Sequence, residues 1–293
     1  MRRTVIDTAV GPRAALVWDD APAGSPWLHF AHATGMNAGL YARLLAPLAD
    51  RFRIVASDAR GHGRTAGLDP RSPDDAPGEE REEWEVFAAD LLAIIDAVDT
   101  DSPWLLTGHS LGGTVSLLAA AARPDRVSGL VLLDPPFIPF AIARALAGTV
   151  APNPMADRAA RRRADYPDVA TARAAWAGRG VFASWSDADL DAYLEDGLRA
   201  TADGVTLACS PLWEAASFRG VSQRVEQALM GLDLPFAVVA GEIGSTVPPA
   251  EFTIMAAHPR CVSAQRLAGT THFLPLERGE TIRAAIDLVA AAT

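Results

Sequence analysis

Residues 108–112, Gly-His-Ser-Leu-Gly, form the stretch of sequence that decides the fold. This pentapeptide fits the pattern G-x-S-x-G, directly follows the apolar run Trp104–Thr107 and opens the helix-forming run Leu111–Ala122. Such an order predicts a strained tight turn from strand to helix, which turns the serine Oγ outward. The flanking glycines remove Cβ atoms where strand and helix approach closely. We therefore predict that Ser110 is a nucleophile, with the N–H of Leu111 placed to stabilise a developing oxyanion.

Around this turn, short apolar runs alternate with longer helical patterns. This alternation is typical of strands joined by crossover helices in a mostly parallel sheet and predicts an α/β fold. The expected strands are Ala14–Trp18, Trp27–His32, Arg53–Asp58, Trp104–Gly108, Val127–Asp134, Phe236–Glu242 and Val262–Leu267, and the expected helices are Leu40–Ala49, Glu80–Val98, Leu111–Ala122 and Thr281–Ala291.

The alternation is interrupted between Pro135 and Leu234, where no strand is predicted and helical patterns carry three tryptophans. We interpret residues 135–234 as a helical cap inserted into a core made of residues 1–134 and 235–293. Its Arg161–Arg163 cluster is expected to be either a solvated helix face or a site for a phosphate or a carboxylate. The Pro- and Asp-rich segment Asp69–Gly78 is expected to be a loop.

Composition excludes several classes of function. The 293 residues carry a formal net charge of −10, which disfavours nucleic-acid binding because phosphates require a basic surface. No apolar run approaches the length of about 18 residues that a membrane span needs, and no leader pattern follows Met1, so a cytoplasmic location is expected. The two cysteines, Cys209 and Cys261, lack metal-ligand spacing and are expected to be buried thiols. No metal or cofactor is predicted.

Two further motifs lie at the ends of the second and third expected strands. Residues 29–35 read His-Phe-Ala-His-Ala-Thr-Gly, and residues 58–64 read Asp-Ala-Arg-Gly-His-Gly-Arg. Together with residues 108–112, they make the chain from Ala14 onward resemble the α/β-hydrolase superfamily. The resemblance implies a mostly parallel, eight-stranded sheet flanked by helices, with an inserted helical cap. It also implies that the N–H of Thr34 is a second oxyanion donor, although Ala33 stands where the family usually has glycine.

A serine hydroxyl is a weak nucleophile at neutral pH and needs an adjacent base. Of the six histidines, His272 follows the last expected strand and precedes the final helix, where the superfamily places its catalytic histidine. The chain order Ser, Asp, His is then preserved. His272 is therefore the predicted base.

Two carboxylates compete to orient this histidine. The commoner family position after strand Phe236–Ala240 holds a glycine here, with Glu242 nearby. The preceding strand ends at Asp134, a position that resembles the one used by haloalkane dehalogenases and certain acyl-CoA hydrolases. We predict Asp134 as the acid and keep Glu242 as the alternative.

A serine at position 110 disfavours dehalogenase and epoxide hydrolase chemistry, which needs a carboxylate nucleophile. Residues 31–37, 206–214 and 272–277 show a weaker resemblance to a group that includes fungal mycophenolic-acid acyl-CoA hydrolase and peroxisomal lipase-like proteins. This resemblance implies a small-molecule ester or thioester with an apolar acyl group. Carbon–carbon or lactone hydrolysis, and ligand binding without catalysis, remain alternatives. The residues expected at the substrate pocket are His32, His109, Phe137, Trp213 and Phe273.

Overall fold

A single eight-stranded sheet forms the core of the computed structural model, which describes residues 1–68, 83–145 and 153–293. Strand β2 runs antiparallel to both of its neighbours, and the strands from β4 to β11 are parallel. In spatial order the strands are β1 (Arg2–Thr8), β2 (Gly11–Trp18), β4 (Arg53–Ser57), β3 (Trp27–Ala31), β5 (Trp104–His109), β6 (Val127–Leu133), β10 (Phe236–Ile243) and β11 (Cys261–Thr271).

Seven of these strands match the predicted ones, and the eighth, β1, was not predicted. It pairs with β2 at the edge of the sheet and is only partly buried, so its apolar pattern is weak. The central strands β5 and β6 are almost entirely buried because helices cover both faces of the sheet. That double burial explains their nearly continuous apolar sequences.

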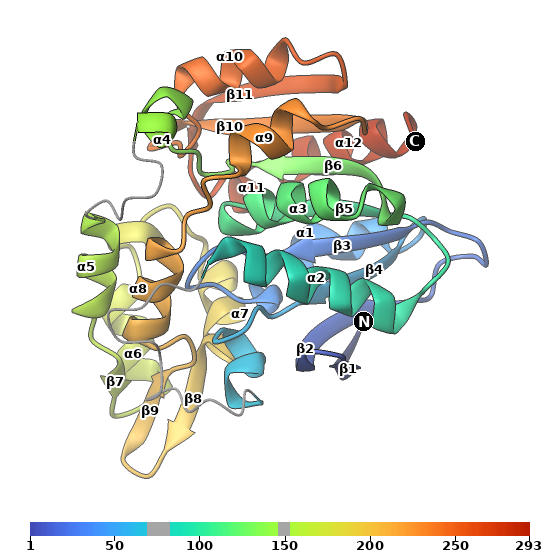
Figure 1. The fold of residues 1–293 in the computed structure, drawn as a ribbon. Helices are drawn as coiled ribbons and strands as arrows, with labels where there is room; N and C mark the ends of the chain where they lie inside the picture. Colours follow the sequence, from blue (N-terminus) through green and yellow to red (C-terminus); the bar gives the residue numbers. More distant parts are fainter. Residues whose placement is uncertain (69–82, 146–152) are drawn as a thin grey trace.

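Helices cover both faces of the sheet (Figure 1). The helices α2 (Trp84–Val98), α3 (Leu111–Ala122) and α9 (Val225–Met230) share one apolar core, and α1 (Ala42–Leu45) and α12 (Gly279–Ala290) contribute to the other. The predicted helix Leu40–Ala49 is divided into the 3-10 turn Ala38–Tyr41, α1 and the 3-10 turn Ala46–Leu48. Pro47 lacks the N–H that a continuous helix would use there.

The predicted helix at 80–98 begins at Trp84 in the described chain, and residues 80–82 of this prediction lie outside the described residues. The predicted loop at 69–78 also lies outside them. Two short helices, α10 (Pro249–Ala256) and α11 (Leu274–Glu277), complete the C-terminal part of the core.

Between β6 and β10 the chain leaves the sheet, and the helices α5, α6, α7 and α8 of this segment lie to one side of it, whereas α9 packs on its face (Figure 1). The prediction that this segment contains no strand was wrong, because three short strands form an antiparallel sheet in the order β7-β9-β8. Strands of two to four residues are too short for a period-two pattern to stand out. The elements are α4 (Phe140–Ala145), α5 (Pro154–Ala160), β7 (Asp165–Tyr166), α6 (Val169–Trp176), α7 (Asp187–Gly197), β8 (Leu198–Thr201), β9 (Gly204–Leu207) and α8 (Pro211–Arg219).

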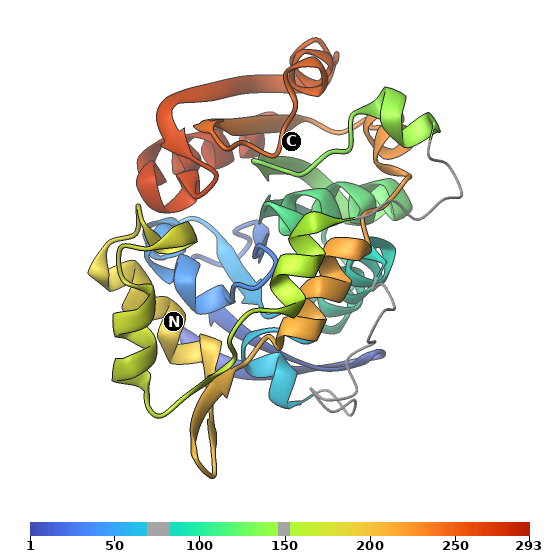
Figure 2. The ribbon, with the colours of Figure 1, turned by 90° about the vertical axis from the view of Figure 1, so that its left-hand side faces the viewer.

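Both ends of the insertion pack on the core rather than on the cap. Phe137 and Phe140 enter the apolar core beneath α3, and helix α9 contributes Val225 and Leu229 to the same core. Figure 2 shows α5 and α8 side by side in the cap, separate from this region. The middle of the insertion joins the other core, because Tyr166, Trp176 and Tyr193 belong to the same apolar cluster as Phe30 and Tyr41.

Strand β5 and helix α3 approach so closely that the turn between them needs glycine. A Cβ atom on Gly108 would lie 2.2 Å from the backbone of Gly112, and one on Gly112 would lie 2.1 Å from the carbonyl oxygen of Ala31. Backbone atoms on rigid elements cannot move aside easily. These contacts fix where α3 begins and therefore where Ser110 lies.

The substitution Gly112→Ala should destabilise the protein by about 3 kcal/mol, because the new methyl group overlaps the end of β3. Exposed Gly67, whose Cβ would meet nothing within 4 Å, provides the matched control, and Gly67→Ala should stay within about 0.5 kcal/mol of the parent. Urea unfolding measures both free energies. Equal stability of the two variants would contradict this account of the turn.

Candidate active site

Two strained residues lie at the carboxyl ends of neighbouring strands. Ser110, between β5 and α3, has φ 53° and ψ −124°, and Asp134, directly after β6, has φ 45°. They are the non-glycine residues with positive φ in the described chain. The N–H of Ser110 donates to the carbonyl oxygen of Leu133 at 2.8 Å, which joins the two strand ends. Strain of this kind is typical of functional sites.

His272 lies between β11 and α11 and reaches the second of these strand ends. Its Nδ1 is 2.6 Å from Oδ2 of Asp134. Because an ionised carboxylate only accepts hydrogen bonds, Nδ1 carries a proton, and in the neutral ring Nε2 is the acceptor. The Asp134 side chain is fully buried, whereas the His272 side chain is 21% exposed. The pair therefore presents a basic nitrogen at the edge of the buried region.

Several donors surround the Asp134 carboxylate besides His272. Oδ1 accepts from the N–H of Gly241 at 2.9 Å and from the Ser245 hydroxyl at 2.6 Å, and Oδ2 accepts from the N–H of Thr246 at 2.9 Å. Burial by itself would raise the pKa of Asp134, but the hydrogen bond and the charge of His272, together with the other donors, outweigh burial and lower it. The carboxylate therefore remains ionised.

Glu242, the alternative acid, lies elsewhere. Its side chain is exposed and accepts a hydrogen bond from the N–H of Gly269 at 2.8 Å. The structure thus brings Asp134, and not Glu242, to the Nδ1 of His272.

Ser110 directly precedes helix α3, and its hydroxyl makes no hydrogen bond with any residue that the structure describes. The N–H groups of Leu111 and Thr34, the two expected oxyanion donors, also lack a partner within the described ranges. Leu111 opens helix α3, so its N–H is one of the donors that a helix leaves unpaired.

His32 holds the loop that carries Thr34. Its Nε2 accepts from the N–H of Ala59 at 2.9 Å, so its Nδ1 carries the proton and donates to the carbonyl oxygen of Ala33 at 2.8 Å. Burial, together with the neighbouring His62 ring, lowers the pKa of His32 to about 3. His32, which was expected at the substrate pocket, is therefore neutral and supports the loop that carries Thr34.

His109 supports the other side of the site. Its ring is fully buried; Nε2 donates to the main-chain carbonyl oxygen of His272 at 2.8 Å, and Nδ1 accepts from the Tyr41 hydroxyl at 2.7 Å. Burial, followed by the adjacent His272 ring, lowers the pKa of His109 to about 3. Sequence reasoning missed Tyr41, which lies in a 3-10 turn with no motif to mark it.

The other expected pocket residues have different surroundings. The Trp213 ring covers Gly61, where a Cβ would lie 2.5 Å from it, and Phe137 belongs to the core beneath α3. Phe273 packs on Trp185 of the cap, with ring centroids 5.1 Å apart. Of the five, only Phe273 thus joins the histidine loop to the cap.

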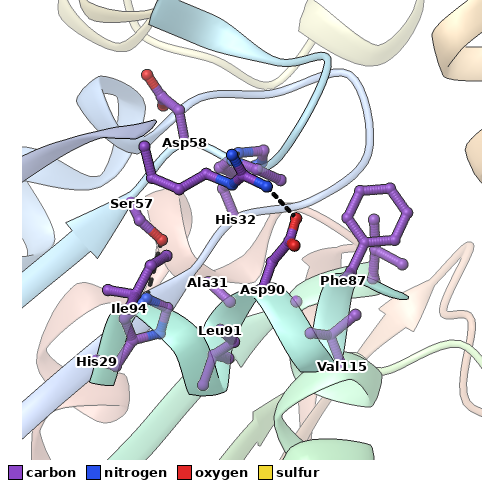
Figure 3. A pocket seen from close by; sticks show the side chains of 14 residues that line it. His29, Ala31, His32, Ser57, Asp58, Phe87, Asp90, Leu91, Ile94 and Val115 are labelled. Carbon is purple, nitrogen blue, oxygen red and sulfur yellow. Dashed lines mark hydrogen bonds and ion pairs between the residues drawn. The ribbon is translucent and has the colours of Figure 1, made fainter. Parts of the chain in front are cut away.

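A small cavity of about 30 Å³, lined by both apolar and charged side chains, lies between α2, α3 and the ends of β3 and β4 (Figure 3). Asp90 pairs there with Arg13 at 3.0 Å and with Arg60, and His29 Nε2 is 2.9 Å from the Ser57 hydroxyl. The cavity has room for about one water molecule, so it does not hold a substrate. Burial lowers the pKa of His29 to about 3.

Two negative findings apply to residues 1–68, 83–145 and 153–293. No group of three His, Cys, Asp or Glu side chains there is arranged to hold a metal ion. No helix in these ranges has both the length and the apolar character needed to cross a membrane.

Comparison with known proteins gives one family. Its model, described as alpha/beta hydrolase fold, matches residues 26–278. Lipase LipV of Mycobacterium tuberculosis is 35% identical over 189 residues, which cover 62% of this chain and 61% of LipV. Monoglyceride lipase of Rattus norvegicus is 35% identical over 120 residues, 39% of this chain and 37% of that lipase. The matches thus omit more than a third of either lipase.

A longer match is 2-(acetamidomethylene)succinate hydrolase of Mesorhizobium japonicum, which is 28% identical over 228 residues, 77% of this chain and 73% of that enzyme. A solved structure of E-2-(acetamidomethylene)succinate hydrolase superposes with a TM-score of 0.76 over 99% of both chains, at 24% identity. This likeness shows a shared fold.

The three buried histidines with pKa values near 3, His29, His32 and His109, should lower the stability of the protein in acid. Because their folded pKa values lie below the unfolded value of about 6.5, the stability that they contribute is present above that pH and is lost as pH falls toward 3. Near pH 5 each should make the free energy of unfolding fall by about 1.4 kcal/mol per pH unit.

Near pH 5 the free energy of unfolding should therefore fall with decreasing pH less steeply in His29→Gln than in the parent, by about 1.4 kcal/mol per pH unit. Above pH 7.5 the two slopes should be equal. Urea unfolding at several pH values measures both slopes. An unchanged slope near pH 5 would show that His29 is protonated in the folded protein.

Proposed function

This chain belongs to the α/β-hydrolase family, and we propose that it is a serine hydrolase that cleaves an ester or thioester of a largely apolar acyl group. The observation that carries the proposal is the 2.6 Å hydrogen bond between His272 and Asp134 beside the strained Ser110. The lipases among its relatives support ester hydrolysis. Thioester hydrolysis rests on the sequence resemblance.

In the proposed mechanism, Nε2 of His272 takes the proton of the Ser110 hydroxyl while Oγ attacks the carbonyl carbon. The carbonyl oxygen gains negative charge and accepts hydrogen bonds from the N–H groups of Leu111 and Thr34. The histidine then protonates the departing alkoxide or thiolate, which leaves an acyl group on Ser110. Water attacks this acyl-enzyme with the same base, releases the carboxylic acid and restores the serine.

Asp134 has a positioning role in this scheme. Its buried carboxylate fixes the Nδ1–H tautomer of His272 and stabilises the imidazolium that forms during each attack. His109 positions His272 indirectly, because it bonds the main-chain carbonyl oxygen of His272, and the Tyr41 hydroxyl in turn bonds His109.

The apolar character of the proposed acyl group rests on the cap. Trp176, Phe182, Trp185 and Tyr193 form a cluster of aromatic rings that meets Phe273, the residue after His272. Trp176, Phe182 and Tyr193 are buried, whereas Trp185 is partly exposed, so the aromatic surface that Trp185 presents beside Phe273 is suited to contact a hydrocarbon chain.

Ser110→Ala should lower kcat by on the order of 10⁶-fold for nitrophenyl esters and acyl-CoA thioesters while leaving the fold intact. A series of acyl chains from short to long identifies the leaving group and the preferred length. In parallel, intact-mass measurement should detect a fluorophosphonate adduct on the parent protein and none on the variant. Full turnover by Ser110→Ala would overturn the proposal, and a parent that neither reacts nor turns over would indicate a binding protein.

Asp134→Asn should lower kcat by roughly 10³–10⁴-fold, because an amide at this position favours the wrong histidine tautomer. Glu242→Gln is the matched control, since its side chain is exposed and bonds a different loop, and it should retain kcat. Steady-state kinetics on the best ester decides between them. If Glu242→Gln lost activity and Asp134→Asn kept it, Glu242 would be the acid that orients His272.

A further inference from the structure

Three buried hydrogen-bond donors of the inserted segment have no partner among the residues that the structure describes: Nη2 of Arg162, Nε1 of Trp185 and Nε of Arg199. Arg199 lines a groove beside β1, whereas Arg162 and Trp185 both border one cluster of aromatic rings. Buried donors are normally paired, because an unpaired one has lost its water without replacement. Two such donors in one part of the cap point to an acceptor that the polypeptide itself does not supply.

Arg162 differs from the arginines beside it in sequence. Arg161 is exposed, and Arg163 stacks on the Tyr166 ring at 4.3 Å. Arg162 instead turns inward, where its Nη1 donates to Oε2 of Glu214 on α8 at 2.9 Å. Only one of the three is therefore placed to serve an internal site.

The guanidinium of Arg162 keeps its charge in this position. Burial by itself would lower the pKa of Arg162, but the neighbouring Tyr193 and Glu214 outweigh burial and raise it. The ion pair with Glu214 uses Nη1, so Nη2 remains as a charged donor.

The surroundings of Arg162 adjoin the oxyanion loop. The Glu214 carboxylate lies 2.9 Å from where a Cβ on Gly35 would be, and the Tyr193 hydroxyl donates to the carbonyl oxygen of Gly35 at 3.2 Å. Gly35 directly follows Thr34, whose N–H is the proposed second oxyanion donor. A side chain on Gly35 would displace the carboxylate that holds Arg162.

The surroundings of Trp185 adjoin the histidine loop. Its ring meets Phe273 at 5.1 Å, and Phe273 directly follows His272. The same ring contacts Tyr193 at 5.7 Å, and Tyr193 contacts Trp176, over which Arg162 lies at 5.7 Å. Trp185 thus belongs to an aromatic cluster over which Arg162 also lies. This cluster contacts Phe273, which follows His272, and Gly35, which follows Thr34.

We infer that Arg162 and Trp185 bind a carboxylate of the substrate, so that the acyl group carries a carboxylate at its far end from the scissile bond. A carboxylate is the acceptor that matches a charged guanidinium and can take a second donor from an indole. The aromatic cluster would hold the methylene chain between the two polar ends. This inference rests on the proposed function, because the acyl group is the one that Ser110 receives.

The test compares three substrates that differ only at the far end of the chain: the mono-4-nitrophenyl ester of adipic acid, its methyl-capped counterpart and 4-nitrophenyl hexanoate. The parent should favour the free carboxylate over the methyl-capped ester in kcat/KM. Arg162→Gln should lower this ratio at least about tenfold, because the charged donor is lost. Trp185→Phe removes only the indole N–H and should lower the ratio by a smaller factor, mainly through KM.

Arg161→Gln is the matched control, since it removes a neighbouring but exposed charge, and its ratio should equal that of the parent. Competition on the parent provides a readout that needs no variant: adipate should inhibit hydrolysis of 4-nitrophenyl hexanoate, and dimethyl adipate should inhibit it less.

The outcomes separate the two proposals. Hydrolysis of all three esters without preference for the carboxylate, or a preference that Arg162→Gln leaves unchanged, would overturn the inference and leave the serine hydrolase intact. Weaker inhibition by adipate than by its dimethyl ester would also overturn it. A parent that hydrolyses none of the esters and does not react with a fluorophosphonate at Ser110 would refute the proposed function itself.

Discussion

The arrangement of the candidate site depends on one buried carboxylate. Asp134 leaves the end of β6 with positive φ, and its two oxygens accept hydrogen bonds from β10, from the loop after β10 and from His272. A buried charge is costly unless it is fully paired, and here the partners come from three different segments. Satisfying this one group therefore fixes the relative positions of β6, β10 and the histidine loop.

A second level of support uses histidines as neutral hydrogen-bonding groups. His32 holds the loop that carries Thr34, and His109 joins Tyr41 to the main chain of His272. Each needs one protonated and one free ring nitrogen, a pattern that protonation would destroy. Burial maintains it by lowering both pKa values to about 3. The framework histidines are thus fully buried and neutral, whereas the proposed base His272 has a side chain that is 21% exposed.

The sequence predicted those parts of the molecule that local rules determine. The turn around Ser110 follows from glycines that a backbone contact requires, and the central strands follow from burial on both faces. The positions of Asp134 and His272 follow from chain order within a known topology. Tyr41 was missed because its role depends on a contact with His109, 68 residues away. The partly buried edge strand β1 and the short cap strands were missed because neither produces a strong pattern.

The cap illustrates why substrate preference is harder to predict than chemistry. In the sequence, Arg161, Arg162 and Arg163 are equivalent, and no periodicity distinguishes them. Their difference arises from Glu214, more than 50 positions later, which helix α8 brings against α5 and which pairs with Arg162 alone. That carboxylate fits only because residue 35 lacks a side chain. Gly35, Glu214 and Arg162 thus form one unit, which joins the inserted segment to the loop that carries Thr34.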